Sequence, residues 1–170
     1  MGETGLLTED SRVELIEGEI VEMAPIASEH GGMVKRLNDL FSSKLHGKAI
    51  VSIQDPVVLG DDSEPQPDIA ILHWRDDFYA TAHPGAQDLL LLVEVSDTTV
   101  CYDHEVKCPL YARHGVPEAW LLNLPERHLE IYREPVNGKY RQVAQHRAGQ
   151  VSPERLPEAA IELTDLFPKP

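Results

Sequence analysis

The fold is decided by the stretch Leu89-Leu90-Leu91-Leu92-Val93-Glu94-Val95, an apolar run that a single acid interrupts. A continuous apolar run of strand length predicts a central β-strand that is covered on both faces. A carboxylate inside such a strand is strongly destabilising unless a cation or a set of hydrogen-bond donors compensates it. Glu94 therefore indicates a functional site at the end of this strand.

The sequence upstream predicts a β-hairpin, a helix and three short strands. Residues 13–23 hold two apolar runs around Glu17-Gly18, and glycine tolerates the positive φ that a tight turn needs. From Ser28 onward, apolar residues recur at spacings of three and four, which predicts an amphipathic helix capped by Ser28 and ended by Gly47. Strands are predicted at residues 49–53, 57–59 and 67–72.

A second helix and more strands are predicted downstream. Residues 102–114 form an amphipathic pattern with Asp103 as a cap, and Pro109 is expected to kink this helix or end its regular hydrogen bonding. Asn137-Gly138 predicts a tight hairpin turn, and residues 153–170 are expected to pack as a short closing segment. Strands are predicted at residues 119–124, 129–133 and 140–144. This order predicts an α/β fold with a mixed β-sheet flanked by helices and an N-terminal β-hairpin.

Length and composition restrict the class of protein. A chain of 170 residues with 42% hydrophobic content predicts a single domain over residues 1–170. No apolar run approaches the roughly 20 residues needed to span a bilayer, and no basic segment leads into one, so we expect a cytoplasmic protein without a membrane partner. Cys101 and Cys108 have no companions at zinc spacing and are expected to be free thiols.

The charge of the chain argues against a polyanionic partner. The 29 acidic and 15 basic residues give a formal net charge of -14, which repels nucleic acid unless the basic side chains gather on one face. The densest basic groups, Lys35-Arg36 and residues 141–147, are small. Any nucleic-acid function has to be reconciled with this excess of acid.

Three residues form a set that suits metal-assisted chemistry. Asp68 follows Pro67 at the start of one strand, Glu94 lies near the end of the next, and Lys107 lies on the following helix. Separately, Pro67-Asp68 fits ordinary turn chemistry, and Lys107 fits a surface pair with Asp103 four residues earlier. Together, two carboxylates can hold Mg²⁺ while a nearby ammonium positions a water and offsets charge on a phosphate.

Six blocks of sequence carry a resemblance to a known family, in the same order along the chain. They are residues 12–20 (RVELIEGEI), Glu29-His30, residues 66–70 (QPDIA), residues 92–96 (LVEVS), Asp103 with Lys107, and residues 111–120 (YARHGVPEAW). Together they resemble the Uma family of predicted restriction endonucleases, which belongs to the PD-(D/E)XK nuclease superfamily. The resemblance covers nearly the whole chain.

This resemblance implies a restriction-endonuclease-like fold and metal-dependent hydrolysis of DNA, with Mg²⁺ as the cofactor and Mn²⁺ as a substitute. It implies Asp68 and Glu94 as metal ligands, together with the backbone carbonyl of Val95, and Lys107 as the residue that assists the attacking water. In the wider superfamily the lysine lies two residues after the second acid, where this chain has Ser96. The polar residues 97–99 also depart from the usual family pattern, without loss of polarity.

Four further residues are candidates for accessory roles. Glu14 and His30 either approach the metal site or face solvent. Gln66 either contacts a phosphate or a water, or solvates a turn. Asp103 is expected to be a helix cap that also orients Lys107.

Two functions of different classes stay open on the sequence alone. The first is an endonuclease, in which a homodimer brings the few basic residues to DNA and pairs or packs through edge strands between residues 129 and 144. The second is a catalytically quiet binding or accessory module, which the acidic composition favours. A purely structural partner protein is the weakest reading, because it leaves Glu94 without an explanation.

Overall fold

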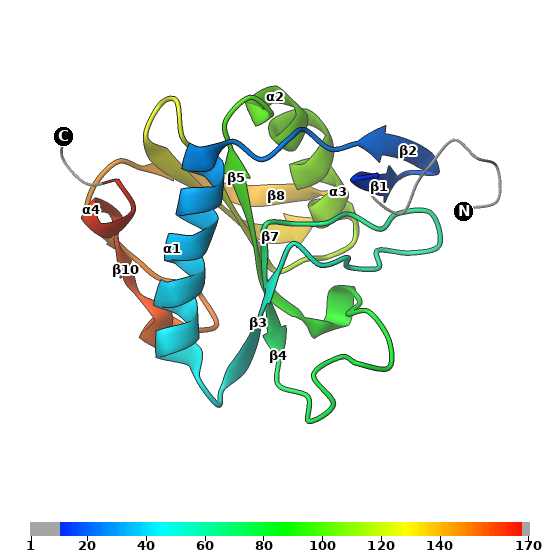
Figure 1. Cartoon of the computed structure of the whole chain (residues 1–170), viewed down its shortest axis with the longest axis horizontal. Coiled ribbons are helices and arrows are strands. Elements are labelled where there is room, and N and C mark those ends of the chain that lie inside the picture. The colour runs from blue at the N-terminus through cyan, green and yellow to red at the C-terminus, as the bar shows by residue number, and fades with distance from the viewer. Residues whose placement is uncertain (1–10, 168–170) are drawn as a thin grey trace.

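The computed structural model describes residues 11–167 and contains a six-stranded mixed sheet between helices (Figure 1). Neighbouring strands are antiparallel except for β5 and β6, which are parallel. In spatial order the strands are β3 (Ala49–Ile53), β4 (Ile69–His73), β5 (Leu89–Ser96), β6 (Glu118–Asn123), β7 (His128–Val136) and β8 (Lys139–His146). The predicted α/β class with a mixed, helix-flanked sheet is confirmed.

Strand β5 is the centre of the sheet, as its apolar run predicts. All eight of its residues are buried. Hydrophobic clusters lie on both faces, and β5 contributes Leu91 and Val93 to one cluster and Leu92 to the other. Glu94 is two residues after Leu92 in the strand, so its side chain points to the same face, the second one. Because both clusters pack on one shared sheet, the single domain stays our prediction.

Helix α1 (Ser28–Leu45) covers the first face of the sheet. Its buried residues recur at helical spacing, and Phe41 packs against Trp120 of β6 with ring centroids 6.0 Å apart. Ser28 is not the cap that the sequence predicts: it is the first helical residue, and Ala27 occupies the N-cap position without a side-chain hydrogen bond. The same face is completed by β9 (Gln150–Val151), the 3₁₀ turn Pro157–Ala159, β10 (Ile161–Glu162) and α4 (Leu163–Leu166).

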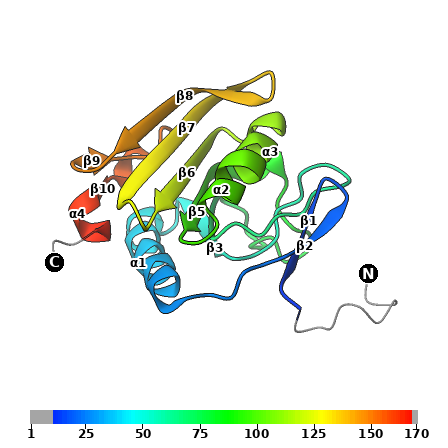
Figure 2. The same ribbon diagram turned by 90° about the horizontal axis from the view of Figure 1, so that it is seen from above.

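The second face carries the helical connection from β5 to β6, which lies across the sheet from α1 (Figure 2). It consists of α2 (Val100–Tyr102), a π-helical turn (Asp103–Lys107) and α3 (Cys108–Arg113). In the π-helical turn the Cys108 N–H donates to the Asp103 carbonyl, five residues back. Pro109 lacks an N–H, and the regular α-helical bonding changes just before it, as its position predicts.

The predicted N-terminal hairpin is present outside the main sheet. Strands β1 (Val13–Ile16) and β2 (Glu19–Glu22) pair antiparallel around Glu17 and Gly18, whose φ angles are 50° and 82°. This pair of positive φ values is typical of the two-residue turns that match strand twist. A bridge from Leu15 to Glu64 and a hydrogen bond from the Glu17 N–H to Ser63 Oγ attach the hairpin to the loop before β4.

Two predicted elements differ in the structure. Residues 57–59 alternate inward and outward like a strand, but Val57 and Leu59 donate their N–H groups to Pro65 and Ser63 within the same loop, so they join no strand of the sheet. Residues 129–133 are not an edge strand, because β7 pairs with both β6 and β8. The edges are β3 and β8, and β8 follows the predicted Asn137-Gly138 turn.

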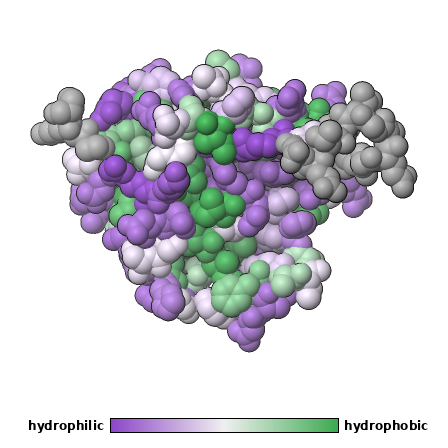
Figure 3. All heavy atoms as spheres, viewed as in Figure 1, coloured by the Kyte–Doolittle hydropathy of each residue, from purple (hydrophilic) through white to green (hydrophobic). Residues whose placement is uncertain are grey.

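One face of the molecule carries a band of hydrophobic residues between polar ones (Figure 3). Figure 3 shows this band down the middle of the face on which α1 passes beside β3. Leu40 of α1 and Val51 and Ile53 of β3 are partly buried and pack against the core. Between residues 11 and 167, no helix combines the length and apolar character required to cross a bilayer. Both cysteines are free thiols, as predicted.

A polar cluster around Glu130 occupies the second face, two strands from Glu94. The register places Glu94, Leu121 and Glu130 in one row across β5, β6 and β7. The Glu130 carboxylate accepts hydrogen bonds from the Tyr132 hydroxyl, from His128 Nε2 at 2.8 Å and from His104 Nε2 at 2.7 Å. Burial alone would raise the pKa of Glu130, but these three contacts hold the pKa below its usual range.

We expect Glu130→Gln to lower the free energy of unfolding by about 2 kcal/mol at neutral pH, because charge-assisted hydrogen bonds are lost. Since the folded-state pKa of Glu130 lies below the unfolded value, this stability is present above pH ~4.5 and disappears as the pH falls through the folded pKa. Urea unfolding at several pH values measures it. A wild-type advantage that does not shrink below pH ~4, or an equal loss in the exposed control Glu105→Gln, would contradict the assignment.

Candidate active site

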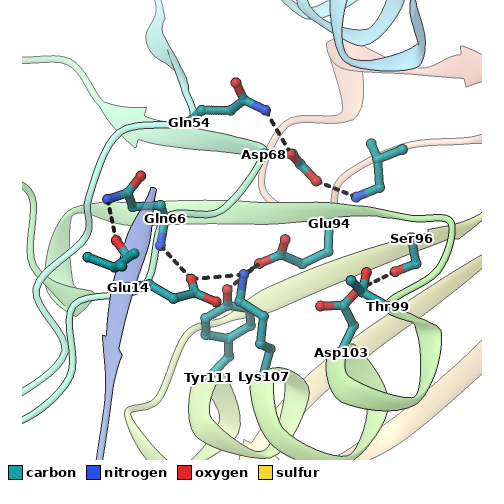
Figure 4. A network of polar contacts seen from close by, with 12 residues as sticks. Glu14, Gln54, Gln66, Asp68, Glu94, Ser96, Thr99, Asp103, Lys107 and Tyr111 are labelled. Carbon is teal, nitrogen blue, oxygen red and sulfur yellow. Dashed lines mark hydrogen bonds and ion pairs between the residues drawn. The ribbon is translucent and has the colours of Figure 1, made fainter. Parts of the chain in front are cut away.

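A cavity lies beside the C-terminal end of β5, where Glu94 is located. Its volume of about 460 Å³ is within the range of small-ligand sites. Residues 21–27, which lead from β2 into α1, form one wall. Residues 97–99 and the start of the α2–α3 connection form another. The polar side chains at its base come from β1, α1, the loop before β4, β5 and the π-helical turn (Figure 4). Asp68, Glu94 and Lys107 all line this cavity.

Asp68 lies just before β4 and is held by three donors. Its Oδ2 accepts the Val95 N–H at 2.8 Å and His30 Nε2 at 3.1 Å, and its Oδ1 accepts Gln54 Nε2 at 3.2 Å. Burial would raise the pKa of Asp68, but the contact with His30 and the other two hydrogen bonds lower it overall. Asp68 is therefore a fixed carboxylate at neutral pH.

Glu94 is buried between two partners on the α2–α3 connection. Its Oε1 accepts the Tyr111 hydroxyl and Lys107 Nζ, the latter at 2.9 Å. Burial raises the pKa of the Glu94 carboxyl to about 8, although the Lys107 ammonium opposes this shift. The carboxylate thus needs further positive charge nearby to be fully ionised, which agrees with the cost that the sequence predicts for an acid in this strand.

Lys107 connects β5 with the N-terminal hairpin. Its ammonium is 2.9 Å from Glu94 Oε1 and 3.3 Å from Glu14 Oε2, and the residue is 4% exposed. Burial would lower the pKa of Lys107, but the two glutamates raise it, so the side chain is a buried cation. Glu14 also accepts the Gln66 N–H at 3.1 Å. The structure therefore brings Glu14 into the site.

The other accessory candidates have definite places. His30 faces the cavity and contacts Asp68. Gln66 uses its side-chain amide to bond the Val13 carbonyl at 3.1 Å, which ties the hairpin to the loop before β4. Asp103 is not the cap predicted at the start of the helix, because the helical segment already begins at Val100. The Asp103 carboxylate accepts hydrogen bonds from the hydroxyls of Ser96 at 2.5 Å and Thr99 at 2.8 Å. No ion pair forms between Asp103 and Lys107 within the described part of the chain.

Sequence reasoning missed the contacts made by Tyr111 and Gln54, and it missed the place of Tyr102 in the lining of the cavity. The ring of Tyr111 is in the core, as its apolar spacing predicts, but its hydroxyl reaches Glu94. Its position four residues after Lys107 is a signal that could have identified it. Gln54 has a φ of 53° after β3, and nothing in the local sequence indicates that it reaches Asp68. Tyr102 lines the cavity from α2.

The charge of the cavity fits a divalent cation. Its lining contains six acids, against Arg12 and Lys107 as the permanent cations. Within residues 11–167, no group of three or more His, Cys, Asp or Glu side chains is arranged to hold a metal ion. Mg²⁺, however, is commonly held by one or two carboxylates while waters and substrate phosphates complete its shell. Asp68 and Glu94 are two carboxylates of this lining. The acids of the lining are Glu14, Glu22, Asp68, Glu94, Asp97 and Asp103.

Comparison with known families decides where the chain belongs. The pattern of the Uma2 family, described as "Putative restriction endonuclease", matches residues 4–164. The chain belongs to the Uma2 family. This confirms the resemblance that its six sequence blocks indicate, and it places the chain in a family of nucleases.

A solved structure shows the same fold as this Uma2-family chain. It is the crystal structure of a "putative nuclease belonging to DUF820" from Anabaena variabilis, which is 19% identical in sequence. The match covers 91% of this chain and 89% of the other, with a TM-score of 0.73. At this identity the likeness shows the fold alone. Among proteins with curated descriptions, none matches the chain.

Proposed function

We propose that this Uma2-family chain is a Mg²⁺-dependent endonuclease that hydrolyses phosphodiester bonds in DNA. The observation that carries the proposal is that Asp68, Glu94 and Lys107 line one acidic cavity at the end of β5. Asp68 and Glu94 would hold the ion together with the Val95 carbonyl, and Mn²⁺ would substitute for Mg²⁺. Membership of a nuclease family supports the reaction class.

Each residue of the proposed site has a physical task. The ion, when bound, supplies Lewis-acid polarisation of the phosphate and lowers the pKa of a bound water. Donors from Val95, His30 and Gln54 fix Asp68, while Tyr111 and Lys107 fix Glu94. An ammonium has three donors, and Glu14 and Glu94 take two of those of Lys107. The third is available to position the attacking water and to offset charge on the phosphate.

The second candidate function is a catalytically quiet module that keeps the fold and the ion without cleaving nucleic acid. The net charge of -14 and the acidic lining of the cavity favour it, because both repel the phosphates of DNA. In the endonuclease, a bound divalent ion would offset part of the negative charge of the cavity. The two functions therefore differ in DNA affinity at low salt in the presence of metal.

Cleavage of plasmid and short duplex DNA in Mg²⁺, Mn²⁺ or EDTA tests the proposal. We expect cleavage with either ion, none in EDTA, and loss of activity in Asp68→Asn and Lys107→Ala. Equal cleavage by the wild type and both variants would identify a contaminating nuclease and overturn the proposal. Calorimetric titration that detects Mn²⁺ binding without DNA affinity would establish the quiet module instead.

We also propose a homodimer located in the cytoplasm. A second copy would double the basic residues presented to DNA, and the sheet offers its unpaired edges, β3 and β8, for contact. Analytical ultracentrifugation at micromolar concentration tests this, with a sedimentation coefficient of a monomer as the contradicting result.

A further inference from the structure

One tyrosine that lines the cavity, Tyr102, has a buried hydroxyl without a hydrogen-bond partner in the described part of the chain. The hydroxyl oxygen of Tyr102 is buried, and no atom of the described residues 11–167 forms a hydrogen bond with it. Tyr102 lines the cavity that contains Asp68, Glu94 and Lys107. Burial, followed by the nearby Glu14 carboxylate, raises the pKa of Tyr102 to about 12, so the phenol is neutral and keeps its proton.

The hydroxyls of the other tyrosines all have hydrogen-bond acceptors. The chain has five tyrosines, and all of them lie within the described residues. Four donate to a named acceptor: Tyr79 to the His73 carbonyl, Tyr111 to Glu94, Tyr132 to Glu130 and Tyr140 to the Val116 carbonyl. Tyr102 is the exception within this part of the chain.

A buried hydroxyl without a partner destabilises the folded state, and phenylalanine would fill the same space without that cost. Within the described residues, two other buried side-chain atoms lack a hydrogen-bond partner, His30 Nδ1 and His128 Nδ1. His30 lines the same cavity as Tyr102, whereas His128 belongs to the Glu130 cluster. Two residues that line one cavity thus each have a buried polar atom without a hydrogen-bond partner among the described residues, which leaves both atoms able to bond a polar ligand.

The chemistry of the lining selects the kind of ligand. Ionised carboxylates only accept hydrogen bonds, yet none of the acids of the cavity accepts one from the Tyr102 hydroxyl. A neutral O–H suits an acceptor that enters with a ligand. Phosphate oxygens are strong acceptors, and tyrosine is among the side chains that contact nucleic-acid phosphates.

We propose that the Tyr102 hydroxyl donates a hydrogen bond to a non-bridging oxygen of the bound phosphodiester. This inference rests on the proposed function, because the phosphodiester is the substrate assigned there. It adds a substrate-contacting residue on α2, beyond the residues that hold the ion or the attacking water. Tyr102 and Lys107 then approach the substrate from the same helical connection.

Tyr102→Phe tests the contact, with Tyr79→Phe as the matched control, since Tyr79 lies outside the cavity and donates only to the His73 carbonyl. The measurement is fluorescence anisotropy of a fluorescein-labelled thymidine octanucleotide, titrated in Ca²⁺ with the full chain. We expect Tyr102→Phe to bind the octanucleotide roughly 10- to 100-fold more weakly, since a charge-assisted hydrogen bond is lost. Its melting temperature should equal or exceed that of the wild type, and Tyr79→Phe should bind like the wild type.

The outcomes separate this inference from the proposed function. Unchanged affinity in Tyr102→Phe overturns the contact, and a partner other than the substrate, such as a water, then explains the buried hydroxyl. Weaker binding together with a lower melting temperature overturns it as well, because the hydroxyl would then have a structural role. If the wild type binds the octanucleotide through Tyr102 but cuts no DNA, the endonuclease fails and the contact stands. If the wild type does not bind the octanucleotide, the contact fails, and DNA cleavage alone decides the endonuclease.

Discussion

Asp68→Asn is expected to reduce metal-dependent DNA cleavage by roughly 10³-fold, equivalent to about 4 kcal/mol in the activation free energy. The amide keeps the size of the side chain but removes the negative charge that would bind the ion. It also retains an oxygen that can accept the hydrogen bonds of Val95 and His30. Gln54 can turn its own carbonyl toward the new amide nitrogen. The fold should therefore persist, with a loss of less than about 1 kcal/mol in stability.

The control for this prediction is Asp39→Asn, which makes the same change of charge on the exposed side of α1. Initial cleavage rates in Mg²⁺, together with calorimetric Mn²⁺ titration of both variants, provide the comparison. Asp68→Asn should lose Mn²⁺ binding, and Asp39→Asn should retain it. If Asp68→Asn binds Mn²⁺ as tightly as the wild type, Asp68 is not a ligand and the proposed metal site is wrong.

Lys107→Met is expected to lower the free energy of unfolding by about 3–5 kcal/mol. Lys107 is the cation that contacts the buried carboxylates of Glu14 and Glu94, and methionine preserves its length without its charge. For a chain of this size, the loss corresponds to a fall of roughly 10 °C in melting temperature. Urea unfolding followed by circular dichroism measures it in metal-free buffer.

A double variant identifies the cause of this loss. Glu94→Gln with Lys107→Met removes one buried carboxylate together with the ammonium, and we expect it to be more stable than Lys107→Met alone. Lys48→Met is the control, because the Lys48–Glu158 pair is exposed and should contribute at most about 1 kcal/mol. Equal losses in Lys48→Met and Lys107→Met would show that the buried ammonium does not compensate the two acids.

The elements of the fold that follow from local pattern were predictable. The apolar run of β5 indicates a strand buried on both faces, and helical spacing indicates α1. The prediction of a strand at residues 57–59 is wrong, because a short apolar run after Pro56 indicates only that a segment is extended. Whether its N–H groups bond a neighbouring strand or the loop itself depends on distant residues.

The main residues of the candidate site were predictable from the cost of burying a charge and from the family resemblance. Glu94 stands out because a carboxylate in an apolar strand demands compensation, whereas Lys107 has no such signal and depends on the family resemblance. The contacts that hold the site are long-range: Glu14 lies far in sequence from Lys107, and Gln54 reaches Asp68 from a turn after β3. A single sequence carries little information about such pairs, because each side chain is ordinary in its own surroundings.

The π-helical turn determines which way the helical connection faces. Asp103, Lys107 and Tyr111 are spaced four residues apart, and a regular α-helix, at about 100° per residue, would rotate Tyr111 about 80° away from Asp103. The π-helical turn contains one residue more than an α-helical turn, and this extra residue changes the offset to about 20° in the opposite direction. All three side chains can therefore point toward the polar end of β5. The turn acts as a rotational spacer, and deleting one residue from it would swing Tyr111 about 100° away from Glu94 while leaving the composition of the site almost unchanged.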